Sequence, residues 1–181
     1  VASALSKVDP LNLFDPVPSE VGYDYWYRLL NCGFKLPASS GTDWFICDSN
    51  RVYVFIGGRF SYDAWLEGLK MGRTFITNTP ALFFSANWRM AGDTIELKGR
   101  SILDVKVEAR SCIPMDCVEI VKNGEVVHRE ELDEGTKEAR FLAPVRVDES
   151  CWIAARCSGA SQTSSGHPIF AHASPIYVEV N

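Results

Sequence analysis

The stretch LPASSGTDWF, residues 36–45, places an acidic side chain where it could hold a metal ion. Small residues form a turn that carries Asp43 at the end of an apolar stretch, which we interpret as a buried strand. Carboxylate oxygens bind divalent cations, but a metal site needs three or four converging ligands. Asp43 is therefore the candidate metal ligand. An aspartate after Gly-Thr can also accept backbone hydrogen bonds in a turn, and this alternative stays open.

The three histidines of the chain do not supply an evident partner for Asp43. His167 and His172 are five residues apart, a spacing that matches neither the HExxH helix motif nor an alternating H-x-H strand pair. His172 can reach a site on the rim of a β-domain, and His128 follows a strand, where it is expected to be exposed. We prefer a hydrogen-bonded or solvated role for these side chains.

Other catalytic signatures are missing from the sequence. There is no G-x-S-x-G motif and no glycine-rich phosphate loop. The acidic run ELDEG at 131–135 is interpreted as a solvated hairpin tip, with weak calcium binding as the alternative. The six cysteines include no C-x-x-C pair, so we expect free thiols rather than a zinc or redox centre, with disulfides as the alternative.

The composition predicts a globular protein with a sizeable core. The chain has 181 residues, of which 46% are hydrophobic, and carries a net charge of -5. An acidic chain is poorly suited to phosphate backbones, so nucleic acid is not expected as a partner. No apolar run reaches the roughly 18 residues that span a bilayer, so no membrane partner is expected. The composition leaves the localisation undetermined.

Residues 1–79 predict a partial α/β segment. After a proline-containing lead-in over 1–20, the stretch EVGYDYWYRLLNCGFKLP has helical apolar spacing, and we expect its aromatic residues to pack in the core. RVYVFIGG predicts a strand. Ser61 can cap a second helix that Gly72 ends, and Thr74 to Thr77 predict a further strand. These few elements are too small a set to form a hydrophobic core by themselves.

Residues 80–181 predict an antiparallel β-sandwich of immunoglobulin type. Apolar runs recur about every ten residues with turns between them, and KNGE carries the Asn-Gly signal of a hairpin. The expected strands lie in ALFFSANW, DTIELK, ILDVKVEAR, CVEIVKNGEVVHRE, EARFLAPVRV, CWIAARC and PIYVEV. The fold class is therefore α+β, with an immunoglobulin-like sandwich after a partial α/β segment and a boundary near residue 79.

Five blocks of the sequence together resemble the C-terminal part of one enzyme family. These are the CehA/McbA-type metallohydrolases of the PHP superfamily, and the blocks are YWYRLLNCGFKLPASSGTDWF, YDAWLEGLKMGRTFITNTP, CVEIVKNGEVV, CWIAARCSG and HASPIYV. The resemblance implies that the first segment is the end of a distorted (β/α)-barrel and that the second is the β-rich tail of this subgroup.

The resemblance implies that Asp43, in the GTD motif, ligates a divalent metal such as zinc, manganese or iron in a full-length parent. Many superfamily members place a histidine two residues later, where this chain has Phe45. The H-x-H motif of the family is also missing. We therefore expect a C-terminal fragment of a metal-dependent hydrolase that binds no metal and is inactive alone, because one carboxylate cannot activate water. Its partner would be the missing N-terminal PHP portion.

Two other functions remain open. A non-catalytic β-sandwich module would show a concave, aromatic-lined patch, for which Trp88 is a candidate, whereas Trp152 is expected in the core. A hydrolase segment would instead expose apolar surface on residues 1–79. A third possibility is a homodimer formed through the open strand edge of the first half.

Overall fold

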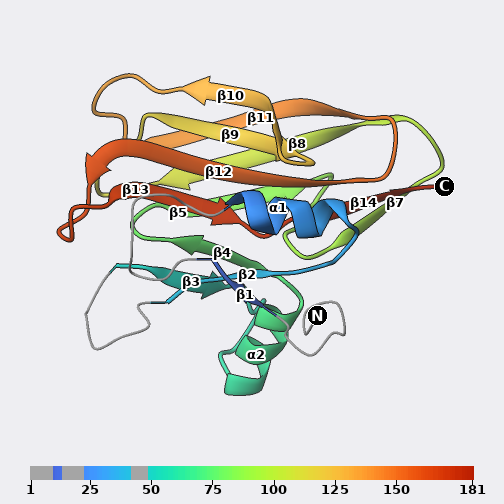
Figure 1. Cartoon of the computed structure of the whole chain (residues 1–181), viewed down its shortest axis with the longest axis horizontal. Coiled ribbons are helices and arrows are strands. Elements are labelled where there is room, and N and C mark those ends of the chain that lie inside the picture. The colour runs from blue at the N-terminus through green and yellow to red at the C-terminus, as the bar shows by residue number, and fades with distance from the viewer. Residues whose placement is uncertain (1–9, 14–22, 42–48) are drawn as a thin grey trace.

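Figure 1 shows the computed structural model of the chain, which describes residues 10–13, 23–41 and 49–181. The described residues form mainly antiparallel β-sheets with two short helices, which confirms a β-sandwich architecture. The candidate ligand Asp43, its neighbour Phe45, Cys47 and most of the lead-in over 1–20 lie outside these ranges.

The smaller sheet has four antiparallel strands in the order β11-β8-β5-β6. These strands are β5 (Ala81–Ala86), β6 (Arg89–Met90), β8 (Ser101–Arg110) and β11 (Glu138–Val147). In β8, Leu103, Val105 and Val107 are fully buried, while Ile102, Asp104 and Lys106 face solvent. One face of this sheet therefore packs on the core and the other is exposed.

The larger sheet has eight strands, six of them in the order β10-β9-β12-β13-β4-β3, with β14 beside β12 and β7 beside β14. Their bounds are β3 (Arg51–Val54), β4 (Thr74–Thr77), β7 (Thr94–Leu97), β9 (Cys117–Lys122), β10 (Glu125–Glu131), β12 (Cys151–Gln162), β13 (Pro168–Ala173) and β14 (Ile176–Val180). The pairings are antiparallel except that of β7 with β14.

The main core lies between the two sheets. It joins the inward side chains of β5, β8 and β11 to those of β9, β12 and β13, including Val105, Val145, Ile120 and Ile153. Each fully buried aliphatic side chain contributes about 1.5–3 kcal/mol, so this layer is the principal source of stability.

The helix α1 (Tyr23–Asn31) covers the outer face of the larger sheet, as Figure 1 shows. Trp26 and Tyr27 are buried against this face, whereas Tyr25 is exposed, so the predicted aromatic helix packs with one side only. The Trp26 indole donates to the Leu36 carbonyl at 2.9 Å, and the Trp152 indole donates to the Asn31 side chain at 2.7 Å. These bonds tie α1 to the segment that follows it and to β12.

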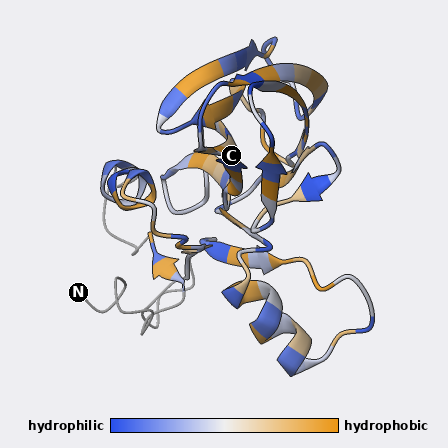
Figure 2. Cartoon of the chain, turned by 90° about the vertical axis from the view of Figure 1, so that its right-hand side faces the viewer, coloured by the Kyte–Doolittle hydropathy of each residue, from blue (hydrophilic) through white to orange (hydrophobic). Residues whose placement is uncertain are grey.

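The second helix, α2 (Tyr62–Lys70), begins and ends at the predicted residues. The Ser61 hydroxyl accepts a hydrogen bond from the Ala64 N–H at 3.1 Å, and Gly72 has φ +74°, the left-handed conformation that ends a helix. Figure 2 shows α2 projecting away from the sandwich. Gly68, the buried residue of α2, packs directly on Val54 of β3.

The larger sheet continues across the predicted boundary at residue 79. β4 pairs antiparallel with β13 of the sandwich, and β3 pairs with β4. Two short strands, β1 (Leu11–Asn12) and β2 (Ala38–Ser39), form a separate parallel pair. The division into units 1–79 and 80–181 stays a prediction, since continuous pairing does not say where a unit ends.

β13 is a strand that the sequence pattern did not predict. Its segment, PIFAHA, is buried on both faces: Ile169 and Ala171 face the main core, and Phe170 and His172 face the α1 layer. A strand buried on both faces shows no alternation of apolar and polar residues, and the flanking serine, glycine and proline residues resemble a loop.

Candidate functional site

The structure does not assemble a metal centre from the described residues. No group of three or more His, Cys, Asp or Glu side chains in 10–13, 23–41 and 49–181 could hold an ion, and Asp43 lies outside these ranges. The metal role of Asp43 therefore stays a prediction. The five described cysteines, Cys32, Cys112, Cys117, Cys151 and Cys157, are free thiols, as expected.

The strand β2, which precedes the GTD motif, is held by hydroxyl groups from distant parts of the chain. The Ala38 N–H donates to the Ser174 hydroxyl at 2.9 Å, and the Thr74 hydroxyl donates to the Ala38 carbonyl at 3.1 Å. The two hydroxyls lie 2.7 Å apart. These hydroxyls hold one edge of β2 beside the first residue of β4, and β1 pairs with the other edge.

His172 is completely buried between β13 and α1. Its Nδ1 lies 2.7 Å from the Ala173 carbonyl, so Nδ1 carries the proton and Nε2 accepts a hydrogen bond from the Tyr27 hydroxyl at 2.6 Å. Burial lowers the pKa of His172 to about 3 and raises the pKa of Tyr27 to about 12. Both groups are neutral and satisfied, which agrees with a structural histidine.

Beside His172, a charged row crosses the larger sheet. Glu119 on β9 is buried and accepts hydrogen bonds from Arg129 on β10 at 2.7 Å and from Arg156 on β12 at 2.5 Å. Arg156 also lies over the ring of Tyr23 on α1, 5.7 Å from its centroid. Each group has a partner, so the row links strands rather than forming an open site.

An open groove lies between the exposed face of the smaller sheet and the β3–β4 end of the larger sheet. Its volume is about 540 Å³. The rings of Tyr53 and Phe75 stack with centroids 5.0 Å apart, and Phe75 meets Phe83 edge-on at 6.1 Å. A second hollow of about 520 Å³ adjoins it and shares Ser85, Trp88 and Lys106.

The groove carries uncompensated positive charge. Lys106 has no ion-pair partner among the described residues, and the Nε atom of Arg73 is buried without a hydrogen-bond partner. The carboxylate of Glu108 forms an ion pair with Arg110 at 2.6 Å. Two cations thus face one carboxylate that already has a partner, and the groove favours an anion.

Trp88 stands at the junction of the two hollows and is 97% exposed. With Asn87 it forms the two-residue loop between β5 and β6, and both residues have positive φ, 44° and 69°. This type I′ geometry favours Asn-Gly, the pair that the chain uses at Asn123-Gly124. A tryptophan at the glycine position is therefore unexpected on structural grounds.

Sequence reasoning identified Trp88 but missed the other groove residues. Trp152, the second tryptophan considered, is 3% exposed and lies in the core as expected. Phe83 sits at a solvent-facing position of the alternating strand β5, which is a usable signal. Tyr53 and Arg73 could not be found, because only the pairing of β4 with β13 brings them beside the sandwich.

His128 and His167 lie away from the groove. His128 is half-buried on β10, 5.0 Å from the ring of Phe141, rather than fully exposed as predicted. His167 precedes β13 in a turn whose backbone pairs with Thr163. Neither helix of the described part is long and apolar enough to span a membrane.

Comparisons with protein families, with characterised proteins and with solved structures return no match to this chain. Its function must therefore be argued from the residues and their geometry.

Proposed function

We propose that this chain is the C-terminal part of a metal-dependent hydrolase that resembles the CehA/McbA-type enzymes of the PHP superfamily. In this proposal, Asp43 binds a divalent metal (zinc, manganese or iron) together with ligands from an N-terminal PHP portion. The chain alone is inactive, because a single carboxylate cannot fix a metal-bound water for attack. The sandwich, which we assign to the immunoglobulin type, is the tail of that enzyme.

The observation that carries this proposal is the set of contacts that hold β2 in place. The strand pairs in parallel with β1, as barrel strands do, and ends four residues before Asp43. Its partners Thr74 and Ser174 come from two other blocks of the family resemblance, GRTFITNTP and HASPIYV. Blocks that are far apart in sequence thus meet at the strand that leads to the proposed metal ligand.

A second observation supports a missing neighbour for the first segment. The strand β3 has no partner on its outer side among the described residues. Large apolar side chains next to β3 and around α2, outside the groove, are exposed, namely Phe60, Tyr62 and Met71. Exposed apolar surface of this extent marks an interaction site, and additional barrel strands would cover it.

The decisive experiment compares this chain with the longer product of its gene. We expect the longer protein to contain an H-x-H motif, to bind metal and to hydrolyse an ester, amide, carbamate or phosphoester. Asp43→Asn in the longer protein should lower its metal content and its kcat, while Asp63→Asn, at the exposed start of α2, should change neither. Stoichiometric metal and hydrolysis in the 181-residue chain alone would refute the proposal.

A non-catalytic binding module is the second candidate, and the concave groove beside Trp88 is the observation that favours it. The two functions are compatible, since a hydrolase tail can carry a ligand site. An activity assay distinguishes them. A binding module that is not part of a hydrolase binds its ligand without hydrolysing it.

A further inference from the structure

We propose that the groove beside Trp88 binds a small organic anion with a flat apolar body, such as an aryl carboxylate. The inference deepens the second candidate function by naming its ligand class, and it holds whether or not the chain belongs to a hydrolase. Three features carry it: the position of Trp88, the prearranged rings of the groove, and two cations. Among the described residues, Lys106 has no ion-pair partner and the Nε of Arg73 has no hydrogen-bond partner.

The position of Trp88 has no structural explanation. A side chain that is 97% exposed contributes nothing to the core, and a non-glycine residue at φ 69° strains the turn. The corresponding position of the other two-residue hairpin is Gly124. Strain that packing does not require points to function, and an exposed indole at the mouth of a groove provides a stacking surface.

The other rings are held in place before any ligand arrives. Tyr53 and Phe75 are neighbours across β3 and β4 and stack with an interplanar angle of 15°. Phe83, on β5 of the opposite sheet, meets Phe75 at 65°. Because these rings already contact one another, a ligand that stacks on them loses little side-chain entropy.

The cations select an anionic ligand over a neutral apolar one. An apolar partner would cover Lys106 and the buried Nε of Arg73 without neutralising them, which costs free energy. A carboxylate instead supplies the missing negative charge, and its planar geometry matches the guanidinium group. Glu108 does not compete, since Arg110 already holds it.

The size of the groove indicates a small molecule. Its volume of about 540 Å³ lies within the range of small-molecule sites, roughly 300–1,000 Å³. The adjoining hollow, with Asp104 and Arg140 in its lining, offers polar groups that can bind substituents of the same ligand. A ligand whose ring system lies in the first hollow and whose carboxylate lies near Lys106 contacts both the aromatic rings and the cation of the groove.

The test is isothermal titration calorimetry of the 181-residue chain with 2-naphthoate and with its neutral analogue, 2-naphthamide. We expect 2-naphthoate to bind with a Kd of roughly 1 mM or tighter, and about tenfold more tightly than the amide. Lys106→Gln and Arg73→Gln should bring the two affinities together. Lys98→Gln, at an exposed lysine outside the groove, should leave the difference unchanged.

A second arm uses Trp88→Gly, which keeps the hairpin because glycine favours its geometry. This variant should bind both probes about tenfold more weakly, the loss expected for one stacking contact. Equal affinities for naphthoate and naphthamide, no binding of either probe, or unchanged binding by Trp88→Gly would each overturn the proposal. None of these results bears on Asp43, so the hydrolase proposal is tested separately.

Discussion

Two buried polar groups on the larger sheet show how single residues adapt to the packing of α1. His172 stays neutral because burial among aromatic side chains, together with the nearby charge of Arg156, lowers its pKa. Glu119 is buried, and its two carboxylate oxygens accept hydrogen bonds from Arg129 and Arg156. A substitution at each residue is expected to change the stability of the fold in its own way.

The buried His172 makes stability dependent on pH. Its pKa is near 6.5 in the unfolded chain and about 3 in the fold, so the unfolded state takes up the proton first as the pH falls. Its contribution to stability is complete above pH 6.5 and declines toward pH 3 by at most about 1.4 kcal/mol per pH unit.

Urea unfolding between pH 7 and pH 4 measures this effect. We expect His172→Gln, whose side chain can still accept the Tyr27 hydrogen bond, to show a shallower decline than the unmodified chain. His167→Gln serves as the control and should keep the original slope. Parallel curves for the unmodified chain and His172→Gln would contradict the assignment.

Neutralising Glu119 should destabilise the sheet. Glu119→Gln leaves Arg156, which is 26% exposed, without its counter-charge, and such losses cost about 3 kcal/mol. Glu138→Gln, at an exposed end of β11, should cost almost nothing. Guanidinium unfolding midpoints compare the two variants, and equal midpoints would mean that the row contributes no net stability.

At the scale of elements, the two type I′ hairpins can be compared directly. Asn123-Gly124 follows the preference of this turn, whereas Asn87-Trp88 violates it at its second position. The local sequence signal therefore identified the β9–β10 hairpin correctly, and it carried no such information for the β5–β6 turn.

Replacing Trp88 should relieve strain in its turn. Trp88→Gly is expected to raise the free energy of unfolding by about 1 kcal/mol, because glycine adopts positive φ without steric cost. The matched variant Gly124→Ala should lower it by a similar amount, since φ there is 95°. Thermal unfolding of both variants tests the prediction, and a clear destabilisation by Trp88→Gly would show that Trp88 has a packing role.

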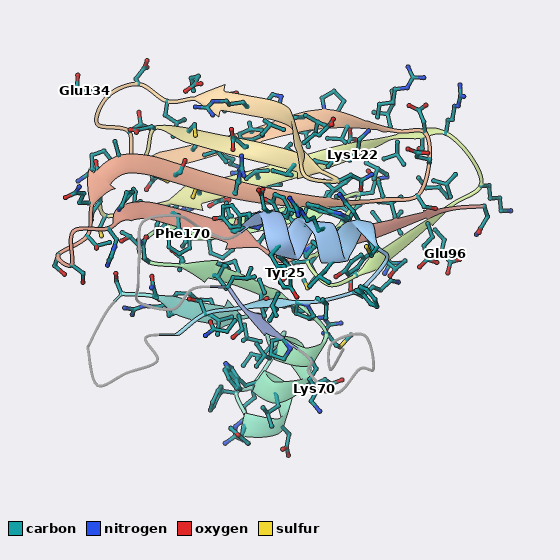
Figure 3. All side chains as sticks on the ribbon, viewed as in Figure 1. Tyr25, Lys70, Glu96, Lys122, Glu134 and Phe170 are labelled. Carbon is teal, nitrogen blue, oxygen red and sulfur yellow. The ribbon has the colours of Figure 1, made fainter. Side chains whose placement is uncertain are left out.

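α2 has little packing support from the described residues. Gly68 packs on Val54, but Trp65 and Leu66 are only half-buried. Figure 3 shows the side chains of α2, with Lys70 labelled, projecting into open space around the helix. The described residues therefore cover only part of the apolar stripe of this amphipathic helix.

For the whole molecule, the two ends of the six-strand series β10-β9-β12-β13-β4-β3 in the larger sheet differ in character. At one end, β10 carries Glu125, Arg129, Glu130 and Glu131, and such charges discourage pairing with other chains. At the other end, β3 reads Arg-Val-Tyr-Val and has one charge at its start. The β3 edge is therefore the one prone to association.

We expect this edge to form a reversible homodimer when no other segment covers it. The Phe55 N–H bonds to the Arg73 carbonyl, so in an antiparallel ladder the N–H of Val52 points to the free edge. Val52→Pro removes that donor and should weaken the dimer. Sedimentation at several concentrations measures it, with circular dichroism to verify the fold. A chain that stays monomeric at all concentrations would contradict the prediction.

Local sequence signals were sufficient for much of this structure. Ser61 and Gly72 bound α2, Asn123 and Gly124 define a hairpin, and alternation in β8 separates its buried and exposed faces. These features depend on neighbours within a few residues, so the sequence specifies them directly. The cysteine thiols and the buried Trp152 were also predicted correctly for the described residues.

The sequence by itself determined the type and most of the boundaries of the strands and helices, because backbone conformation and alternation are local properties. Only the tertiary structure decided that β13 is an interior strand and that β4 joins it. That pairing brings Tyr53 and Arg73 beside Phe83 and Lys106 and so creates the groove. Contacts between residues that are distant in sequence depend on how the sheets pack, and no local pattern encodes them.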